Sequence, residues 1–219
     1  MSTGTWEGLD LALHVGDDPD AVRTNRDRLA AWAGGPVRFG RQVHGTTALV
    51  VGPAEKDADV READALVTAD RGVPVGVLVA DCVPVLLADA EAGVAAAVHA
   101  GRRGLLAGVL GSALDTMIGL GARVGRVRAA IGPAAGGCCY EVPAELADEA
   151  AADRPELRAT TTWGTPSLDL RAGAAAELSR RGVADVAVVG GCTIEDPALY
   201  SYRRRRTTGR FAGVVVLLP

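Results

Sequence analysis

The sequence predicts an α+β fold built on mixed β-sheets. Strand-like and helix-like segments are interleaved along 219 residues, without the regular strand-helix period of a doubly wound protein. Several apolar runs are continuous rather than alternating, which is typical of strands buried on both faces. The chain is 48% hydrophobic but only 4% aromatic, so Ala, Val and Leu must fill the core. This length is compatible with one domain over residues 1–219.

The first half of the chain predicts one helix followed by a group of strands. The stretch DPDAVRTNRDRLAAWAGG begins with Asp, has apolar residues near helical spacing and ends in a Gly pair, which predicts a helix over residues 21–33. Residues 37–52 are typical of extended structure interrupted at Gly45. Residues 63–101 contain two or three apolar runs bounded by Asp, Gly and Pro, and these predict the central strands.

The second half predicts three helices among further strands. Apolar residues recur at three and four positions over residues 105–121, and a Gly ends this stretch, which indicates a helix. Residues 127–142 predict a strand that runs into a Gly-rich loop, and Pro143 lies near the first turn of the next helix. Residues 167–182 predict a helix that ends at Gly182. Strands over residues 183–191 and 211–218 complete the prediction.

Charge and composition argue against several classes of function. The net charge is −4, from 23 basic and 27 acidic residues, so no long polyanion such as nucleic acid is expected as a partner. The run Arg203–Arg206 then predicts a loop whose first arginines fix neighbouring structure. The first residues show no basic region followed by an apolar run, no stretch of about 18 consecutive apolar residues occurs, and the four cysteines are too irregularly spaced for a disulfide framework. We therefore expect a cytoplasmic protein with reduced thiols and no membrane partner.

Three chemically distinctive residues each end a strand-like run. His44 lies in RQVHG, Cys82 in ADCVP and His99 in VHAGRRG, each followed within two residues by Gly or Pro. Two imidazoles and one thiolate form a competent zinc set with an open fourth position. The spacing matches no zinc knuckle, so the residues alone also allow a buried, apolar Cys82 with hydrogen-bonded loop histidines. A Cys82 and His99 pair acting as nucleophile and base in a cysteine hydrolase is a third interpretation.

The turn GRRG after His99 is a candidate anion-binding site. Backbone N–H groups at a helix start favour phosphate, and Arg103 or Arg102 would add charge. The second choices are Arg41, Arg203 and Arg204. Each of these arginines could equally be a solvated surface charge.

Two further cysteines, Cys138 and Cys139, are adjacent in the chain. Side chains of neighbouring residues in a strand point to opposite sides. We therefore expect at most one of them to share a site, and burial for both.

An ordered set of motifs resembles one known family. RQVHG, ADALVT followed by ADCVPVLLAD, VHAGRRG, IGPAAGGCCYEV, DLR, GCT and SYRRRRTTGRFAGVVVL follow the order found in the YfiH-like laccase-domain family, also called the peptidoglycan editing factor family. Its members are described as polyphenol oxidases and as purine nucleoside phosphorylases. The resemblance extends from about Gly16 to the C-terminus and implies two packed mixed β-sheets flanked by helices.

The resemblance also implies a site and a reaction. The family's metal ligands fall on His44, Cys82 and His99, which with Arg103 are the implied catalytic residues. The implied cofactor is Zn²⁺, with Cu²⁺ also reported for the family. The implied reactions are phosphorolysis of adenosine, inosine and methylthioadenosine to base and pentose 1-phosphate, and adenosine deamination. Purine nucleosides and phosphate are thus the implied partners, and no oligomeric state is implied.

Three departures from the family pattern accompany the resemblance. Arg102 stands where the family has tryptophan, and Gly173 and Ala174 stand where an asparagine is common after DLR. The N-terminal segment ahead of LALHVGDD is shorter than is usual, so an edge strand is expected to be missing or the start to be misplaced. Three alternatives stay open: a cysteine hydrolase or amidase acting on a muropeptide-like substrate, a copper-dependent polyphenol oxidase, and a non-enzymatic module that a metal stabilises.

Overall fold

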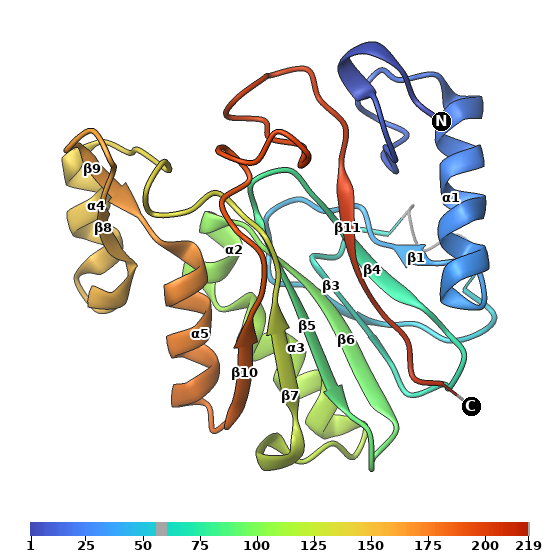
Figure 1. Cartoon of the computed structure of the whole chain (residues 1–219). Helices are drawn as coiled ribbons and strands as arrows, with labels where there is room; N and C mark the ends of the chain where they lie inside the picture. The colour runs from blue at the N-terminus through green and yellow to red at the C-terminus, as the bar shows by residue number, and fades with distance from the viewer. Residues whose placement is uncertain (56–60, 219) are drawn as a thin grey trace.

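Two mixed β-sheets pack together, and helices cover their outer faces (Figure 1). The computed structural model describes residues 1–55 and 61–218. The larger sheet has the order β10-β7-β5-β6-β3-β2, and the smaller has the order β1-β4-β11. Their strands are β1 (Arg38–Phe39), β2 (Ala48–Val50), β3 (Ala65–Thr68), β4 (Val75–Val79), β5 (Val83–Asp89), β6 (Val94–Ala100), β7 (Arg128–Ile131), β10 (Asp185–Val188) and β11 (Phe211–Val215). A separate antiparallel pair joins β8 (Arg158–Thr160) and β9 (Pro166–Leu168).

Both sheets combine parallel and antiparallel pairing. In the smaller sheet β4 pairs parallel with β1 and antiparallel with β11. In the larger sheet the two outer pairs, β2 with β3 and β10 with β7, are parallel, whereas β3, β6, β5 and β7 pair antiparallel. The fold class predicted from the sequence is thereby confirmed.

The helices match the predicted positions with two corrections. Their bounds are α1 (Pro19–Ala33), α2 (Arg102–Ala107), α3 (Val109–Gly119), α4 (Ala144–Ala151) and α5 (Leu170–Arg180). The helix predicted over 105–121 is two helices, because Gly108 adopts a left-handed φ of 97° between α2 and α3. The helix predicted over 167–182 begins only at Leu170, since Pro166–Leu168 forms β9 and the Asp169 carboxylate caps α5.

Three groups of buried side chains hold the layers together. Leu29 of α1 packs with Phe39 and Leu78, so α1 covers the outer face of the smaller sheet. Between the sheets, Val75 and Val77 of β4 pack with residues of β3 and β6. The largest core joins the opposite face of the larger sheet to α2, α3, α4 and α5. Strands β3, β4 and β6 are buried along their whole length, as their continuous apolar runs predicted.

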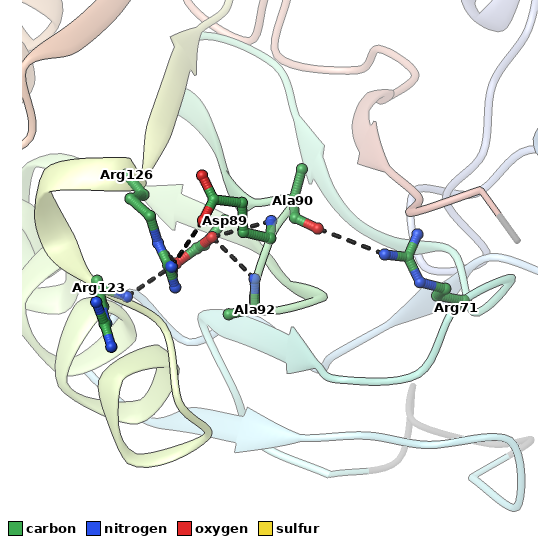
Figure 2. A network of polar contacts seen from close by, with 7 residues as sticks. Arg71, Asp89, Ala90, Ala92, Arg123 and Arg126 are labelled. Carbon is green, nitrogen blue, oxygen red and sulfur yellow. Dashed lines mark hydrogen bonds and ion pairs between the residues drawn. The ribbon is translucent and has the colours of Figure 1, made fainter.

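A buried carboxylate fixes one end of β5 (Figure 2). Asp89, the last residue of β5, has no exposed surface and accepts hydrogen bonds from the backbone N–H of Arg123 and from the Arg126 guanidinium. It also accepts from the backbone N–H of Ala92, while Arg71 donates to the carbonyl of Ala90. These contacts tie the turn after β5 to the segment that precedes β7 and to the turn before β4.

Across residues 1–55 and 61–218, no helix has both the length and the apolar character needed to cross a membrane.

Candidate metal centre

Three strand ends bring His44, Cys82 and His99 together. His44 lies in the connection between β1 and β2, Cys82 in the link between β4 and β5, and His99 next to the end of β6. Their ligand atoms all lie within 4.8 Å of one another. The Cys82 Sγ is 3.6 Å from the His44 Nε2, and the two imidazole rings meet edge to face. The predicted triad is therefore one spatial cluster.

Two glycines allow this close approach. A Cβ at Gly101 would lie 2.5 Å from the His44 Cδ2 and 3.2 Å from the Cys82 Sγ. A Cβ at Gly104 would lie 2.8 Å from the carbonyl oxygen of Gly45. Any side chain at either position would push the His44 loop away from the turn. The Gly-Arg-Arg-Gly turn therefore sets the shape of the site as well as its charge.

Asp64 holds both histidines in place. Its buried carboxylate lies 2.7 Å from the His99 Nδ1 and accepts the backbone N–H of His44 at 2.9 Å and of Gly45 at 2.7 Å. These bonds stabilise the His44 backbone, which has a positive φ of 61°. Because the His99 Nδ1 is engaged by Asp64, its Nε2 is left to face the cluster.

The cluster favours a thiolate beside an imidazolium. Burial opposes ionisation of Cys82, but hydrogen bonds to His44 and His99 outweigh it and lower the pKa of the thiol to about 6. Burial also disfavours charge on His99, yet the Asp64 hydrogen bond and the Cys82 neighbour raise its pKa to about 9. At neutral pH the pair therefore carries opposite charges.

The donor set fits a zinc ion. Two imidazole nitrogens and one thiolate are ligands that zinc prefers, and three protein ligands leave one position for substrate or solvent. The Asp64 bond to the His99 Nδ1 is the carboxylate-histidine arrangement that orients metal-binding imidazoles. The residues present are thus suited to hold the implied metal.

A cavity of about 310 Å³ opens beside the cluster. Its wall includes His44 and Cys82 together with aromatic and basic side chains. The remaining lining residues are Ala80, Asp81, Arg102, Arg103, Tyr140, Leu170, Tyr202 and Arg203. A second cavity, lined in part by Arg41 and Arg210, meets the same His44 and Cys82 and also reaches His99. The cluster therefore lies where two cavities join.

The structure separates the predicted phosphate-binding arginines into two groups. Arg102 and Arg103 line the first cavity, and within the described residues no ion pair engages either of them. Arg203 lines it as well and lies over the Tyr140 ring with its guanidinium carbon 4.5 Å from the ring centroid.

The other two predicted arginines have structural contacts. Arg204 donates to the backbone carbonyls of Thr193 and Asp196, as predicted for an arginine that fixes its loop. Arg41 pairs with Glu62 at 2.6 Å on the rim of the second cavity.

The expectation for Cys138 and Cys139 was wrong in two respects. The two residues lie in a turn and not in a strand, so their side chains do not diverge. Their sulfur atoms are 3.1 Å apart, which means that both thiols share one location. Cys139 is buried as expected, whereas Cys138 is half-buried.

Sequence reasoning missed three residues of the site. In the sequence, Asp64 and Asp81 stand out only as residues that flank apolar runs, and Tyr140 only as part of a loop motif. Asp81 has a positive φ of 88° and accepts hydrogen bonds from the Thr193 hydroxyl at 2.6 Å and the Arg203 backbone N–H at 2.7 Å. Buried carboxylates directly before an apolar strand or a cysteine are the signal that could have indicated these roles.

The fold and the site define a class: two packed mixed sheets with a His-Cys-His cluster on strand-end loops. The family model described as multi-copper polyphenol oxidoreductase laccase matches residues 1–218. The chain therefore belongs to this laccase-like family, which includes the YfiH-like proteins.

Comparison with individual proteins supports the same family. The chain is 51% identical to "Purine nucleoside phosphorylase SCO2081" of Streptomyces coelicolor, over 99% of this chain and 91% of the relative. It is 49% identical to "Purine nucleoside phosphorylase Rv2149c" of Mycobacterium tuberculosis, over 98% and 87%. The crystal structure of YlmD from Geobacillus stearothermophilus is similar, with a TM-score of 0.89, 31% identity and coverage of 100% of this chain and 88% of that one.

Proposed function

We propose that this protein is a zinc-dependent purine nucleoside phosphorylase that also deaminates adenosine. The observation that carries the proposal is one cavity lined by His44 and Cys82 and also by Arg102, Arg103 and two tyrosines. The names of relatives about half identical in sequence support the same assignment. Free thiols in the described part of the chain suit a reducing compartment, and we place the protein in the cytoplasm.

The basic side of the cavity supplies the phosphate site in this proposal. The guanidinium groups of Arg103 and Arg102 bind the phosphate dianion and hold it against the ribose C1′. Tyr140, covered by Arg203 on one face, and Tyr202 offer ring surfaces for the purine. Because Arg102 replaces the family's tryptophan, the cavity has a second guanidinium group beside Arg103 where an aromatic ring would otherwise lie.

Phosphorolysis then needs no reactant other than the nucleoside and hydrogen phosphate. A phosphate oxygen forms a bond to C1′ while the bond from C1′ to the purine nitrogen breaks. The proton of hydrogen phosphate ends on the departing base, giving free purine and ribose 1-phosphate. In deamination water adds at C6 and ammonia leaves, giving inosine.

In both reactions, the role of His44, Cys82 and His99 is to hold the metal ion beside the cavity. Without the metal, the Cys82 thiolate and the His99 imidazolium form a charged pair at neutral pH, and the His99 Nε2 would lose its proton so that both side chains could hold zinc together with His44. When bound, zinc would supply Lewis-acid chemistry at this wall.

The experiment that tests the proposal is product analysis of purified protein incubated with adenosine, with and without phosphate. We expect adenine and ribose 1-phosphate only when phosphate is present, and inosine in both cases. Both activities should be lost on chelation and restored by zinc. Metal-free protein with the full rate would contradict the proposal.

The phosphate site has a separate test in Arg103→Ala. We expect the KM for phosphate to rise about tenfold, because a charge-assisted hydrogen bond contributes about 1.5 kcal/mol or more. The KM for adenosine should stay near the wild-type value. Arg28→Ala, at an exposed position of α1 outside the cavity, is the matched control. An unchanged phosphate KM in Arg103→Ala would remove this residue from the site.

One arrangement favours a second candidate function. Cys82, His99 and Asp64 form a thiolate, imidazole and carboxylate series, which is also the pattern of a cysteine hydrolase. If neither adenine nor inosine forms, release of amine from a muropeptide-like amide, blocked by alkylation of Cys82, would identify this activity. Oxidation of a phenol dependent on added copper would instead identify the polyphenol oxidase that the family's description names.

A further inference from the structure

A second group of metal-ligating side chains lies outside the triad. It consists of Cys138, Cys139, Cys192 and Glu195, whose ligand atoms all lie within 4.8 Å of one another. The Cys138 Sγ is 3.1 Å from the Cys139 Sγ and 3.3 Å from the Glu195 Oε2. We call this group the cysteine cluster. Three thiols and a carboxylate at this spacing have no part in the phosphorolysis proposed above.

The fold brings the cluster together from two loops. Strands β7 and β10 are parallel neighbours, and the loops that follow them continue side by side through a bridge between Ala134 and Cys192. Gly136 provides the room, because a Cβ there would lie 3.2 Å from the Cys138 Sγ and 3.3 Å from the Cys192 Cβ. The turn that contains Cys138 and Cys139 then directs both sulfur atoms toward the Cys192 loop.

A backbone donor points at the Cys192 sulfur. The Gly136 N–H donates to the Cys192 Sγ at 3.3 Å. Backbone N–H groups aimed at a ligating sulfur are the outer contacts that orient and tune metal ligands.

We propose that the cysteine cluster is a second, structural zinc site with three thiolate ligands and one carboxylate ligand. Tetrahedral zinc with bonds of about 2.3 Å separates its sulfur ligands by about 3.8 Å. All four ligand atoms lie within 4.8 Å of one another, and the Cys138 and Cys139 sulfur atoms, now 3.1 Å apart, would need to separate by about 0.7 Å to bind one ion. Four protein ligands close the coordination sphere, whereas the triad leaves one position open.

The position of this site indicates what the metal would do. One of its loops leads directly into Tyr140, which lines the first cavity. The other contains Thr193, whose hydroxyl donates to Asp81 at 2.6 Å, and Asp81 in turn accepts the Arg203 backbone N–H. A metal that joins the two loops would therefore brace two walls of the cavity. Cys192 and Cys139 are buried, which suits a structural site and not a reactive one.

The first test is metal content, measured by elemental analysis and native mass spectrometry on protein saturated with zinc and desalted. We expect about two equivalents in the wild type and about one in Cys192→Ser and in Cys82→Ser. Glu195→Gln leaves all thiols in place and should weaken the affinity of the second equivalent only. Glu149→Gln, at an exposed position of α4, is its matched control.

Cobalt gives a readout that depends on the number of thiolates. The cluster would contribute three of the four cobalt-bound thiolates, so Cys192→Ser should lose about three quarters of the near-ultraviolet thiolate charge-transfer absorbance. Cys82→Ser should lose about one quarter. Should Cys192→Ser fail to fold, the wild-type absorbance and the Glu195→Gln affinity still decide the question.

Two results would overturn the proposal. The first is a single equivalent of metal in the wild type that Cys82→Ser removes completely. The second is loss of two titratable thiols in denatured wild-type protein without reductant, which would show that the cluster forms a disulfide. Four titratable thiols with two equivalents of metal would support the site.

Discussion

Asp64 orients both histidines of the candidate metal centre, which none of the three predicted ligands does by itself. Its carboxylate fixes the His99 ring through Nδ1 and simultaneously receives backbone N–H groups of the loop that carries His44. One residue thus sets the direction of one imidazole and the backbone of the other. It touches neither cavity and acts through the histidines, so it is a positioning residue.

Replacing Asp64 tests this role directly. In Asp64→Asn the amide group cannot accept all the N–H groups that the carboxylate receives, and the negative charge beside His99 is lost. We expect zinc affinity at the triad to fall by about 10- to 100-fold. Competition with a chromogenic chelator measures the effect in a Cys192→Ser background, where only the triad would bind.

The control for that measurement is Asp115→Asn, which removes one carboxylate from an exposed position of α3. It should leave zinc affinity unchanged. Wild-type zinc affinity in Asp64→Asn would show that the histidines are held by other contacts.

At the residue scale, the sequence indicated the three candidate ligands but not the residues that hold them in place. His44, Cys82 and His99 are rare residue types at strand ends, so their chemistry alone drew attention to them. Asp64 is an ordinary strand-bounding aspartate in the sequence, and its partners lie 20 and 35 positions away. Only the pairing of β3 with β6 brings it to His99.

At the scale of elements, strand β5 has two differently built ends. Its first residue follows Cys82, and Cys82 lines both cavities. Its last residue is Asp89, buried among the donors of Arg123, Arg126 and Ala92 (Figure 2). The second end anchors the strand far from the chemistry, so it can be weakened without touching the site.

Asp89→Asn should therefore destabilise the protein and leave catalysis intact. The variant removes the buried charged partner of the partly buried Arg126 guanidinium, which keeps only its ion pair with the exposed Glu91. We expect the free energy of unfolding to fall by about 3 kcal/mol, or Tm by about 6–12 °C. Urea unfolding measures the first quantity, and kcat at a temperature where both proteins are folded should be equal. A change in unfolding free energy below about 0.5 kcal/mol would contradict the role of this network.

The same residue gives a pH dependence with a defined sign. Burial opposes ionisation of Asp89, but the N–H donors and Arg126 outweigh it and lower its pKa in the folded protein. Its stabilising contribution is thus complete above the unfolded value of about 3.9 and is lost as the pH falls through the lower folded value. The difference between wild type and Asp89→Asn should be constant from pH 5 to about 8 and shrink below about pH 4.

Secondary-structure elements were predicted best where a single local feature of the sequence, such as a continuous apolar run, indicated them. The continuous apolar runs identified β3, β5 and β6 because each is buried on both faces or nearly so. Strand β4 has a continuous apolar run as well, but it belongs to the smaller sheet. The run could not show this, because central strands of both sheets are buried to the same extent. The break at Gly108 and the start of α5 after β9 depend on a left-handed turn and a pairing that helical spacing does not reveal.

At the scale of the whole molecule, neither sheet has a complete core of its own. Val75 and Val77 of the smaller sheet fill the space against Leu66 and Ala97 of the larger one. The C-terminal strand β11 pairs with β4 and approaches β5 closely, because a Cβ at Gly213 would lie 2.9 Å from Pro84. The link that contains Cys82 joins the two sheets directly. Unfolding either sheet would therefore expose the inner face of the other.

This shared core predicts that residues 1–219 unfold as one domain in a single transition. Far-ultraviolet circular dichroism follows both sheets, and fluorescence follows Trp6 in the N-terminal segment, Trp32 in α1 and Trp163 between β8 and β9. Urea curves from the two probes should coincide. Leu66→Ala, between the sheets, should shift both midpoints together with a loss of about 3 kcal/mol, whereas Val188→Ala on the exposed edge strand β10 should shift neither. If the probes separate, or only one of them responds to Leu66→Ala, the sheets form independent folding units.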